Sequence, residues 1–278
     1  MKLMKCFPLQ FLLCVLFASS VPAATVDGIK IYSSESGKGP KTVILVHGWT
    51  CDSSSWESQV PELSKDYRVI TLDLPGHGQS GSPEDGVLSM DLFARAVEAV
   101  RAETKADRVA LAGHSMGAAV ILQYARMYPQ HVAALVSVDG LVTGFESSKA
   151  PPFNAEQFAG PEGMKMREGM VRGMFSTLTT EDMQKHILSM MLAAPPSTAS
   201  GAMQAILDPA LWQEGVIPQP LLGIYAGNST LGPDPEQLKT RFPNLEFEII
   251  PDTGHFLMIE KPEEFNRLLK SFLDRQKY

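Results

Sequence analysis

A serine between two glycines, in Gly113-His114-Ser115-Met116-Gly117, is the stretch best suited to chemistry. It follows the aliphatic run 108–112 and precedes 118–125, which is rich in good helix formers. Strand, tight turn and helix are therefore expected to meet at Ser115, the context in which a G-x-S-x-G motif carries meaning. Such a turn exposes the serine hydroxyl above a sheet. Met116 would be the first residue of the helix, so its backbone N–H could donate a hydrogen bond to an oxyanion. The alternative is a glycine–serine turn that arises by chance and has no catalytic role. The rest of the sequence must distinguish between the two.

Apolar runs and helical periodicity alternate along the chain. Strands are expected at 26–33, 42–46, 68–73, 108–112, 132–139, 220–225 and 245–250, and helices at 53–64, 89–104, 118–125 and 262–273. The run 42–46 is apolar nearly throughout, which is typical of a strand buried on both faces. Strands that alternate with helices imply right-handed crossovers. The sequence therefore predicts an α/β fold with a mostly parallel central sheet flanked by helices.

Composition changes between residues 141 and 215. Two proline pairs interrupt this segment, and it contains eight of the fourteen methionines. Met166, Met170 and Met174 recur at helical spacing, and a similar pattern follows from Met183 to Met191. We interpret 141–215 as a helical cap inserted into a core formed by 24–140 and 216–278. The methionines could provide an adaptable apolar pocket or simply pack the cap.

Residues 1–23 have the features of a secretory signal. Lys2 and Lys5 form a positive region, an apolar run follows, and small residues precede Ala24. The apolar run is short for a permanent membrane anchor. Cleavage would leave Cys51 as the only cysteine, so no internal disulfide is expected in a periplasmic or secreted protein.

The net charge of −7, with no basic run after the N-terminus, makes nucleic acid and anionic membrane surfaces poor partners. No pair of histidines has convincing metal spacing. The oligomeric state is left open by the sequence.

Four motifs fall in order, each at an expected strand end. They are His47-Gly48-Trp49, Asp73-Leu74-Pro75-Gly76-His77-Gly78-Gln79-Ser80, Gly113-His114-Ser115-Met116-Gly117 and Gly254-His255-Phe256. With them, the mature chain resembles the α/β-hydrolase superfamily, in the form that carries a helical cap. The resemblance implies that Ser115 attacks a carbonyl carbon and His255 takes its proton, without a cofactor. It also implies that the backbone N–H groups of Trp49 and Met116 bind the oxyanion, and that His47, His77 and His114 shape the surrounding loops.

The acid of the triad departs from the family pattern. The family usually has an aspartate just after the strand expected at 221–226, where this chain reads Gly227-Asn228-Ser229-Thr230. Asp234 is the first carboxylate downstream, but it could instead cap a helix. Asp139 ends the preceding strand, the place where pancreatic-type lipases carry their acid. We favour Asp139, with Asp234 as the alternative; a histidine without any carboxylate partner would leave a slow enzyme.

The leading functional hypothesis is hydrolysis of a carboxylic ester, or of a lactone, through an acyl-serine with a Ser-His-Asp triad. The substrate would be a small molecule with an apolar acyl group. Carbon–carbon bond hydrolysis and cofactor-free perhydrolysis are compatible with the same residues. Dehalogenation and epoxide opening are disfavoured because they generally use an aspartate where Ser115 stands. A non-catalytic ligand-binding protein on the same scaffold is the alternative from another class.

Overall fold

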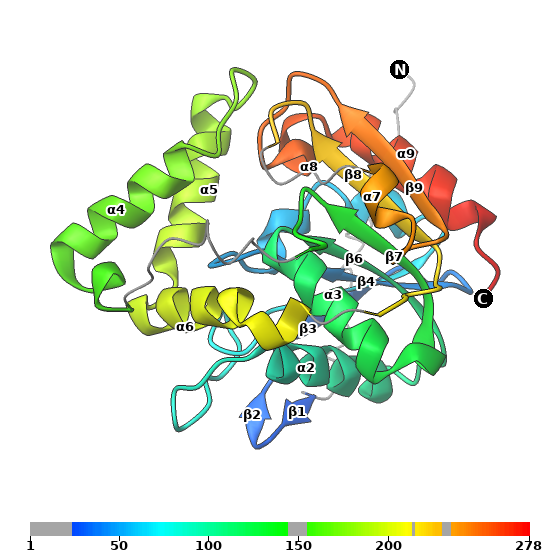
Figure 1. Ribbon diagram of the computed structural model, residues 1–278, viewed down its shortest axis with the longest axis horizontal. Helices are drawn as coiled ribbons and strands as arrows, with labels where there is room; N and C mark the ends of the chain where they lie inside the picture. Colours follow the sequence, from blue (N-terminus) through cyan, green and yellow to red (C-terminus); the bar gives the residue numbers. More distant parts are fainter. Residues whose placement is uncertain (1–23, 144–154, 213–214, 230–234) are drawn as a thin grey trace, which may run out of the picture.

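The computed structural model describes residues 24–143, 155–212, 215–229 and 235–278. Its centre is a seven-stranded sheet with the order β3-β5-β4-β6-β7-β8-β9 (Figure 1). The strands are β3 (Ser33–Ser36), β4 (Thr42–Val46), β5 (Arg68–Leu72), β6 (Val109–His114), β7 (Val132–Val138), β8 (Leu221–Ala226) and β9 (Leu245–Ile250). Only β3 pairs antiparallel in this sheet, so the predicted mostly parallel sheet is confirmed. The strand expected at 26–33 is instead divided between a separate pair, β1 (Thr25–Val26) and β2 (Ile29–Lys30), and the start of β3.

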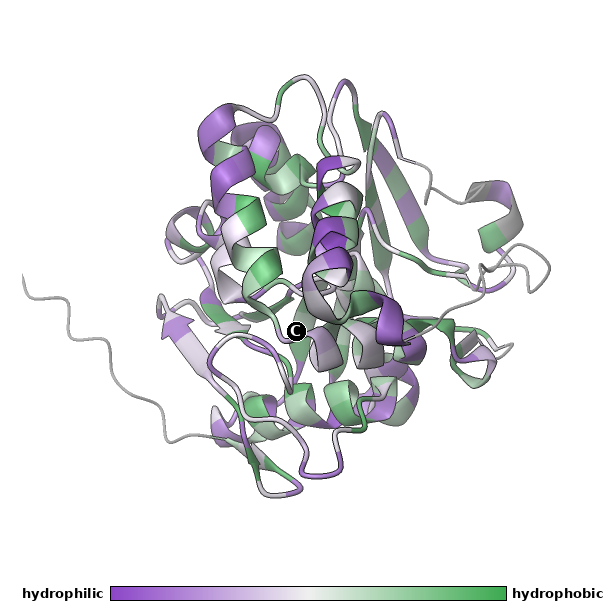
Figure 2. Ribbon diagram, turned by 90° about the vertical axis from the view of Figure 1, so that its left-hand side faces the viewer, coloured by the Kyte–Doolittle hydropathy of each residue, from purple (hydrophilic) through white to green (hydrophobic). Residues whose placement is uncertain are grey.

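The middle strands form the core because their side chains are apolar on both faces. Every residue of β4, β6, β7 and β8 is buried, whereas in the edge strand β9 only Ile250 is buried and the other positions are exposed or half-buried. Figure 2 shows both hydrophobic and hydrophilic residues on the surface helices, as expected for helices that cover a core with one face. A continuous aliphatic run can be covered only by packing on both sides, which fixes these strands in the middle layer.

The chain reverses its direction of travel across the sheet between β4 and β6. It runs from β4 outward to β5, then crosses back to β6 on the other side of β4 and continues to β9. In open α/β sheets, ligands bind at the carboxyl ends of the strands at such a switch point. The loop after β4 begins with His47, and β6 ends immediately before Ser115. The topology therefore brings both motifs to the edge where a binding site is expected.

The helices follow the predicted alternation, with one exception. They are α1 (Val60–Leu63), α2 (Met90–Glu103), α3 (Met116–Met127), α4 (Gly160–Arg172), α5 (Glu181–Ala193), α6 (Pro196–Leu207), α7 (Pro235–Leu238), α8 (Leu257–Glu260) and α9 (Pro262–Arg275). The single helix expected at 53–64 is wrong. A 3₁₀ turn, Ser53–Trp56, capped by Asp52, is followed by the short α1. Pro61 has no N–H to continue a preceding helix and stands in the first turn of a new one.

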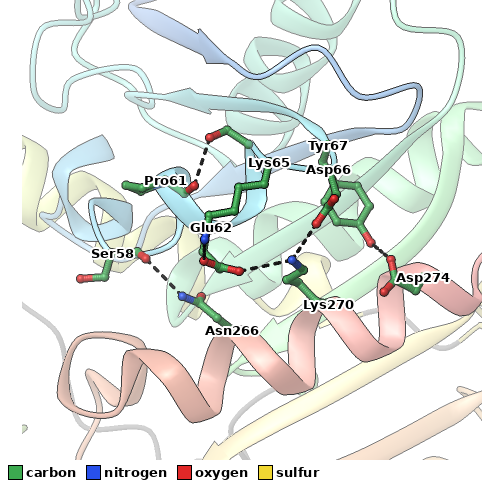
Figure 3. Close-up of polar contacts among 10 residues, drawn as sticks. Ser58, Pro61, Glu62, Lys65, Asp66, Tyr67, Asn266, Lys270 and Asp274 are labelled. Atoms are coloured by element: carbon green, nitrogen blue, oxygen red, sulfur yellow. Dashed lines mark hydrogen bonds and ion pairs between the residues drawn. The ribbon is translucent and has the colours of Figure 1, made fainter.

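Helix α9 fastens the C-terminal part of the chain to the core. Its buried apolar stripe includes Phe265, Leu269 and Phe272, and supplies most of the packing. Figure 3 shows the polar rim of this contact, where Lys270 bridges Glu62 at 3.3 Å and Asp66 at 2.7 Å. Such solvent-exposed ion pairs contribute little to stability, so they orient the helix more than they stabilise it. Because α9 closely follows α8 and the His255 loop, this contact restrains that loop.

Three longer helices, α4, α5 and α6, lie between β7 and β8 in the sequence and gather on one side of the sheet (Figure 1). Their methionines divide between the two expected roles. Met190 and Met191 are buried in packing, whereas Met174 and Met203 line a pocket. Met166 is more than a third exposed. Within the described ranges, no helix is long and apolar enough to cross a membrane.

Candidate active site

Ser115 occupies a strained turn between β6 and α3. Its φ of 54° and ψ of −115° lie in a region that non-glycine residues rarely adopt. The flanking glycines permit this turn: a Cβ on Gly113 would lie 2.2 Å from the Gly117 carbonyl oxygen, and one on Gly117 would lie 2.4 Å from that of Val46. The Ser115 N–H donates to the carbonyl of Val138 at 2.9 Å. The turn is thereby attached to the end of β7.

Two backbone amides are available next to Ser115 for an oxyanion. Met116 is the first residue of α3, so its N–H has no carbonyl within the helix to bind. Gly48 lies against the nucleophile turn, since a Cβ there would be 3.1 Å from that of Ser115. This places the peptide that carries the Trp49 amide beside the turn.

His47 fixes the orientation of that peptide. Its Nε2 accepts the Leu74 N–H at 2.9 Å, so its Nδ1 carries the proton that is donated to the Gly48 carbonyl at 2.8 Å. The Gly48 carbonyl and the Trp49 N–H belong to one trans peptide unit and point in opposite directions. Holding the carbonyl therefore aims the Trp49 amide away from His47. This is the loop-shaping role expected for His47.

His255 and Asp139 form a hydrogen-bonded pair. His255 Nδ1 lies 2.7 Å from Asp139 Oδ2, and the two side chains are 11% and 2% exposed. Oδ1 of Asp139 accepts the Ala226 N–H at 3.0 Å, and the Ser229 hydroxyl also bonds the carboxylate. Burial alone would raise the pKa of the Asp139 carboxyl, but these bonds and the His255 charge hold it below its usual value. The geometry suits a carboxylate that fixes the imidazole tautomer and leaves Nε2 free.

The position of this acid follows from strand pairing. β7 and β8 are parallel neighbours, so their carboxyl ends meet at the same edge of the sheet. Residues 227–229 after β8 carry no carboxylate, and Ser229 instead donates to the one at the end of β7. Asp234, the alternative acid, lies outside the described residues.

Tyr225 is a supporting residue that the motifs did not indicate. It is buried on β8, and its hydroxyl donates to the Gly140 carbonyl at 2.9 Å. Asp139 has a φ of 40°, which is unfavourable for a non-glycine residue, so neighbouring residues must stabilise this backbone conformation. Gly140 is itself confined, since a Cβ there would lie 2.3 Å from that of Ala118. The sequence indicates only that Tyr225 lies in a mostly apolar strand, and not that its hydroxyl has a partner.

Replacing Tyr225 by phenylalanine is expected to leave the buried Gly140 carbonyl without its donor. The unfolding free energy should fall by about 1–3 kcal/mol. The kcat for a reactive ester should fall on the order of 10-fold, because Asp139 loses a neighbouring restraint. Urea unfolding and initial-rate kinetics measure the two effects. Tyr32→Phe, at a surface tyrosine, is the matched control; an unchanged kcat in Tyr225→Phe would contradict this supporting role.

His114 lies directly beneath the His255 loop. Its ring centroid is 4.6 Å from that of His255, and its Nε2–H donates to the His255 carbonyl at 2.8 Å. Burial, reinforced by the charge of His255, lowers the pKa of His114 to about 3. His114 is therefore neutral and acts as a packing and anchoring residue.

The buried histidines predict a specific loss of stability in mild acid. Burial lowers the pKa of His47 to about 4 and that of His77 to about 3, from an ordinary value of 6.5. Between pH 6.5 and 4 the unfolded chain binds these protons and the folded protein does not. The contribution of these neutral histidines to the free energy of unfolding is therefore fully present above pH 6.5. It falls as the pH drops below that value, by up to about 1.4 kcal/mol per pH unit for each histidine.

Urea unfolding at pH 7.5 and pH 5.0 tests this prediction. Asp139 titrates below that window, because its pKa is lowered. His77→Gln should reduce the difference in unfolding free energy between the two pH values, because it removes one of the buried imidazoles. Equal unfolding free energies at both pH values would contradict the prediction.

A cavity of about 310 Å³ connects these groups. Ser115, His255 and Asp139 line it together with Trp49, and Asn228 and Ser229 add polar groups. The rest of its wall is mostly apolar and comes largely from the segment between β7 and β8: Leu141, Gly173, Met174, Phe175, Met203 and Ile206, with Gly254 from the His255 loop. In the described part of the chain, no three His, Cys, Asp or Glu side chains form a group that could hold a metal ion. The predicted triad residues thus face one pocket.

Cys51 does not belong to this pocket. It is a free thiol, 2% exposed, and burial raises its pKa strongly. A buried thiol of this kind is inert and packs as a small apolar residue.

Comparisons with known proteins agree with the fold described above. A sequence model of the alpha/beta hydrolase fold family matches residues 41–170. The chain is 28% identical to a dihydrolipoyllysine-residue acetyltransferase component of an acetoin cleaving system from Cupriavidus necator, over 92% of this chain and 70% of that one. It is also 28% identical to a 2-hydroxy-6-oxononadienedioate/2-hydroxy-6-oxononatrienedioate hydrolase from Paraburkholderia phymatum, over 88% and 91% of the two chains. A thermophilic esterase from Thermogutta terrifontis is 25% identical, with a TM-score of 0.80 over 92% of this chain and 97% of that one.

The sheet order, the serine turn and these comparisons define one class of protein. The chain belongs to the α/β-hydrolase superfamily. It is an α/β hydrolase, and a small-molecule substrate is consistent with the hydrolases it resembles.

Proposed function

We propose that this hydrolase cleaves a carboxylic ester, or a lactone, through an acyl-enzyme at Ser115. The observation that carries the proposal is the His255–Asp139 pair, with 2.7 Å between Nδ1 and Oδ2, facing the pocket that Ser115 also lines. A serine hydroxyl is a weak nucleophile near neutral pH and needs an oriented base. The pair supplies that base, and the strained turn presents the hydroxyl to it.

Each residue then has a defined part in the reaction. Ser115 Oγ forms a bond to the carbonyl carbon while His255 Nε2 takes its proton. The tetrahedral oxyanion accepts hydrogen bonds from the Met116 and Trp49 amides. His255 returns the proton to the leaving alcohol, and the same nitrogen next takes a proton from water that attacks the acyl carbon. The second tetrahedral intermediate then breaks its bond to Ser115 Oγ, which takes the proton back from His255, and the acid is released. Asp139 stays ionised throughout and stabilises the imidazolium.

The pocket favours a small, uncharged substrate with an apolar acyl group. A volume of about 310 Å³ is near the lower limit of typical ligand pockets. Among the residues described in its wall there is no lysine or arginine to pair with a substrate carboxylate. Burying an unpaired charge is costly, so anionic substrates are disfavoured. Met174 and Met203 give the wall the adaptability to accept several acyl shapes.

Carbon–carbon bond hydrolysis is the second candidate, because the substrate named for the Paraburkholderia phymatum hydrolase contains no ester or lactone bond to cleave. The substrate in that name is a dioate, with two carboxylates. The described pocket wall offers such a molecule no cationic partner. The acetyltransferase component named above is longer than this chain, so we base the proposal on the site rather than on that component's activity.

A substrate panel distinguishes the two candidates. p-Nitrophenyl acetate, butyrate and octanoate and γ- and δ-lactones represent the first, and a 2-hydroxy-6-oxo-dienoate represents the second. We expect the highest kcat/KM for a short uncharged ester or lactone, with Ser115→Ala as the blank for each compound. Faster turnover of the dienoate than of every ester and lactone would reverse the assignment.

We also propose that the protein acts outside the cytoplasm, in the periplasm or as a secreted enzyme. The proposal rests on Lys2, Lys5 and the apolar run that follows, all within residues 1–23 and outside the described structure. Mass spectrometry of the protein from its native host is expected to find a first residue near Ala24. An intact N-terminus in a cytoplasmic fraction would contradict the proposal.

A further inference from the structure

A buried carboxylate lies just behind the His255 loop. Glu260 ends α8 and is 8% exposed. Its Oε2 accepts the Gly254 N–H at 2.6 Å and the Ser176 hydroxyl at 2.9 Å, and its Oε1 accepts the hydroxyl of Thr179. An ionised carboxylate only accepts hydrogen bonds, and all three partners are donors. The charge is thus satisfied by three charge-assisted bonds.

These donors come from two parts of the chain. Gly254 immediately precedes the proposed base, whereas Ser176 and Thr179 belong to the connection 173–180 between α4 and α5 of the cap. Thr179 Oγ1 also accepts the Ser176 N–H at 2.8 Å, so this connection is folded around the carboxylate. One side chain therefore bonds both the base loop and the cap.

The two backbones are also in direct contact. The His255 N–H donates to the Met174 carbonyl at 3.0 Å. A Cβ on Gly254 would lie 2.6 Å from the same carbonyl oxygen and 2.9 Å from the Ser176 nitrogen, so only glycine permits this approach. The cap connection thus reaches the backbone of His255 itself.

The same connection forms part of the substrate pocket. Gly173, Met174 and Phe175 line the cavity together with Gly254 and His255. We propose that Glu260 is a positioning residue that ties the cap connection 173–180 to the His255 loop, so that the pocket wall and the general base are held as one unit. This inference rests on the proposed function, because it assigns Glu260 a part in the work of His255.

Substitutions at the two sides of the contact should have different kinetic effects. Glu260→Gln replaces one acceptor oxygen by a donor and removes the charge, so a donor in the base loop or the cap loses its partner. We expect kcat, and the rate at which a fluorophosphonate labels Ser115, to fall about 10- to 100-fold, as for other small misplacements of reacting groups. Ser176→Ala and Thr179→Val release only the cap side, and should raise KM several-fold with a smaller change in kcat.

Glu263→Gln is the matched control, since it makes the same change at an exposed residue three positions further on. It should leave kcat, KM and labelling unchanged. A Glu260→Gln enzyme with lower stability but a kcat and labelling rate equal to those of the control would overturn the proposal. If Glu260→Gln does not fold, a KM in Ser176→Ala and Thr179→Val equal to that of the wild type overturns it.

Hydrogen exchange tests the contact without any substrate. In Glu260→Gln the amides of Gly254 and His255 should exchange faster than in Glu263→Gln, by about 10-fold or more. The Gly254 amide loses its acceptor, and the His255 amide depends on the cap connection that Glu260 holds in place. In Ser176→Ala only the His255 amide should do so. Unchanged protection of both amides overturns the proposal. Wild-type protein that neither turns over esters nor labels would refute the proposed function, while the exchange result would still decide whether Glu260 joins the two segments.

Discussion

Replacing Ser115 by alanine is expected to reduce ester hydrolysis by on the order of 10⁴-fold or more, as in other triads. The change removes only the hydroxyl that would form the acyl-enzyme. The Ser115 side chain makes no capping bond to α3, so the helix loses no support. The strained turn is held by Gly113 and Gly117, which the substitution leaves in place. Initial rates with p-nitrophenyl butyrate and the urea midpoint measure both consequences.

Ser34→Ala, at an exposed serine on the edge strand β3, is the control for this substitution. It should leave the rate and the midpoint at their wild-type values. Fluorophosphonate labelling should disappear in Ser115→Ala and persist in the control. Retained turnover of a good ester by the alanine variant would remove Ser115 from the mechanism.

The second large effect is expected at Asp139. Asparagine has the same shape, and its carbonyl oxygen can keep the Ala226 N–H. Its NH₂ would then face His255 Nδ1 and favour the tautomer in which Nε2 carries the proton. Such an imidazole cannot accept the proton of Ser115. We expect kcat to fall by up to about 10⁴-fold, the effect of this change in a comparable triad.

Asp234→Asn is the matched control for the identity of the acid. If Asp139 is the acid, Asp234→Asn should alter kcat and the unfolding free energy little, because asparagine caps a helix about as well as aspartate does. Parallel kcat measurements on the two variants decide the matter. A large loss in Asp234→Asn with little loss in Asp139→Asn would move the role to Asp234.

Much of this site could be predicted from the sequence because local rules govern its parts. The turn at Ser115 follows from an aliphatic run, two glycines and a helix-forming segment, all within a few residues. The pairing of Asp139 with His255 was harder to predict, since either of two strand ends could have carried a carboxylate. The choice depends on donors that only the folded chain brings together, namely the Ala226 amide and the Ser229 hydroxyl.

The supporting residues could not be predicted, for a physical reason. Tyr225 and its partner Gly140 are 85 positions apart in the chain, and Glu260 and Ser176 are 84 apart. No periodicity or spacing encodes such contacts, because they depend on how the cap and the last strands approach the core. The helix expected at 53–64 is divided for a local reason: Pro61 has no N–H to donate, so a new helix begins there.

Detection of the acyl-enzyme tests the central claim most directly. The protein is mixed with excess p-nitrophenyl ester in a stopped-flow instrument, quenched in acid during the first turnover, digested and analysed by mass spectrometry. We predict a burst of p-nitrophenol close to one equivalent per enzyme if release of the acid is the slower half-reaction, and an acyl group on the peptide that contains Ser115. The acyl group should be absent from Ser115→Ala. Steady hydrolysis with no adduct at Ser115, or an adduct on another residue that turns over at the catalytic rate, would contradict the account.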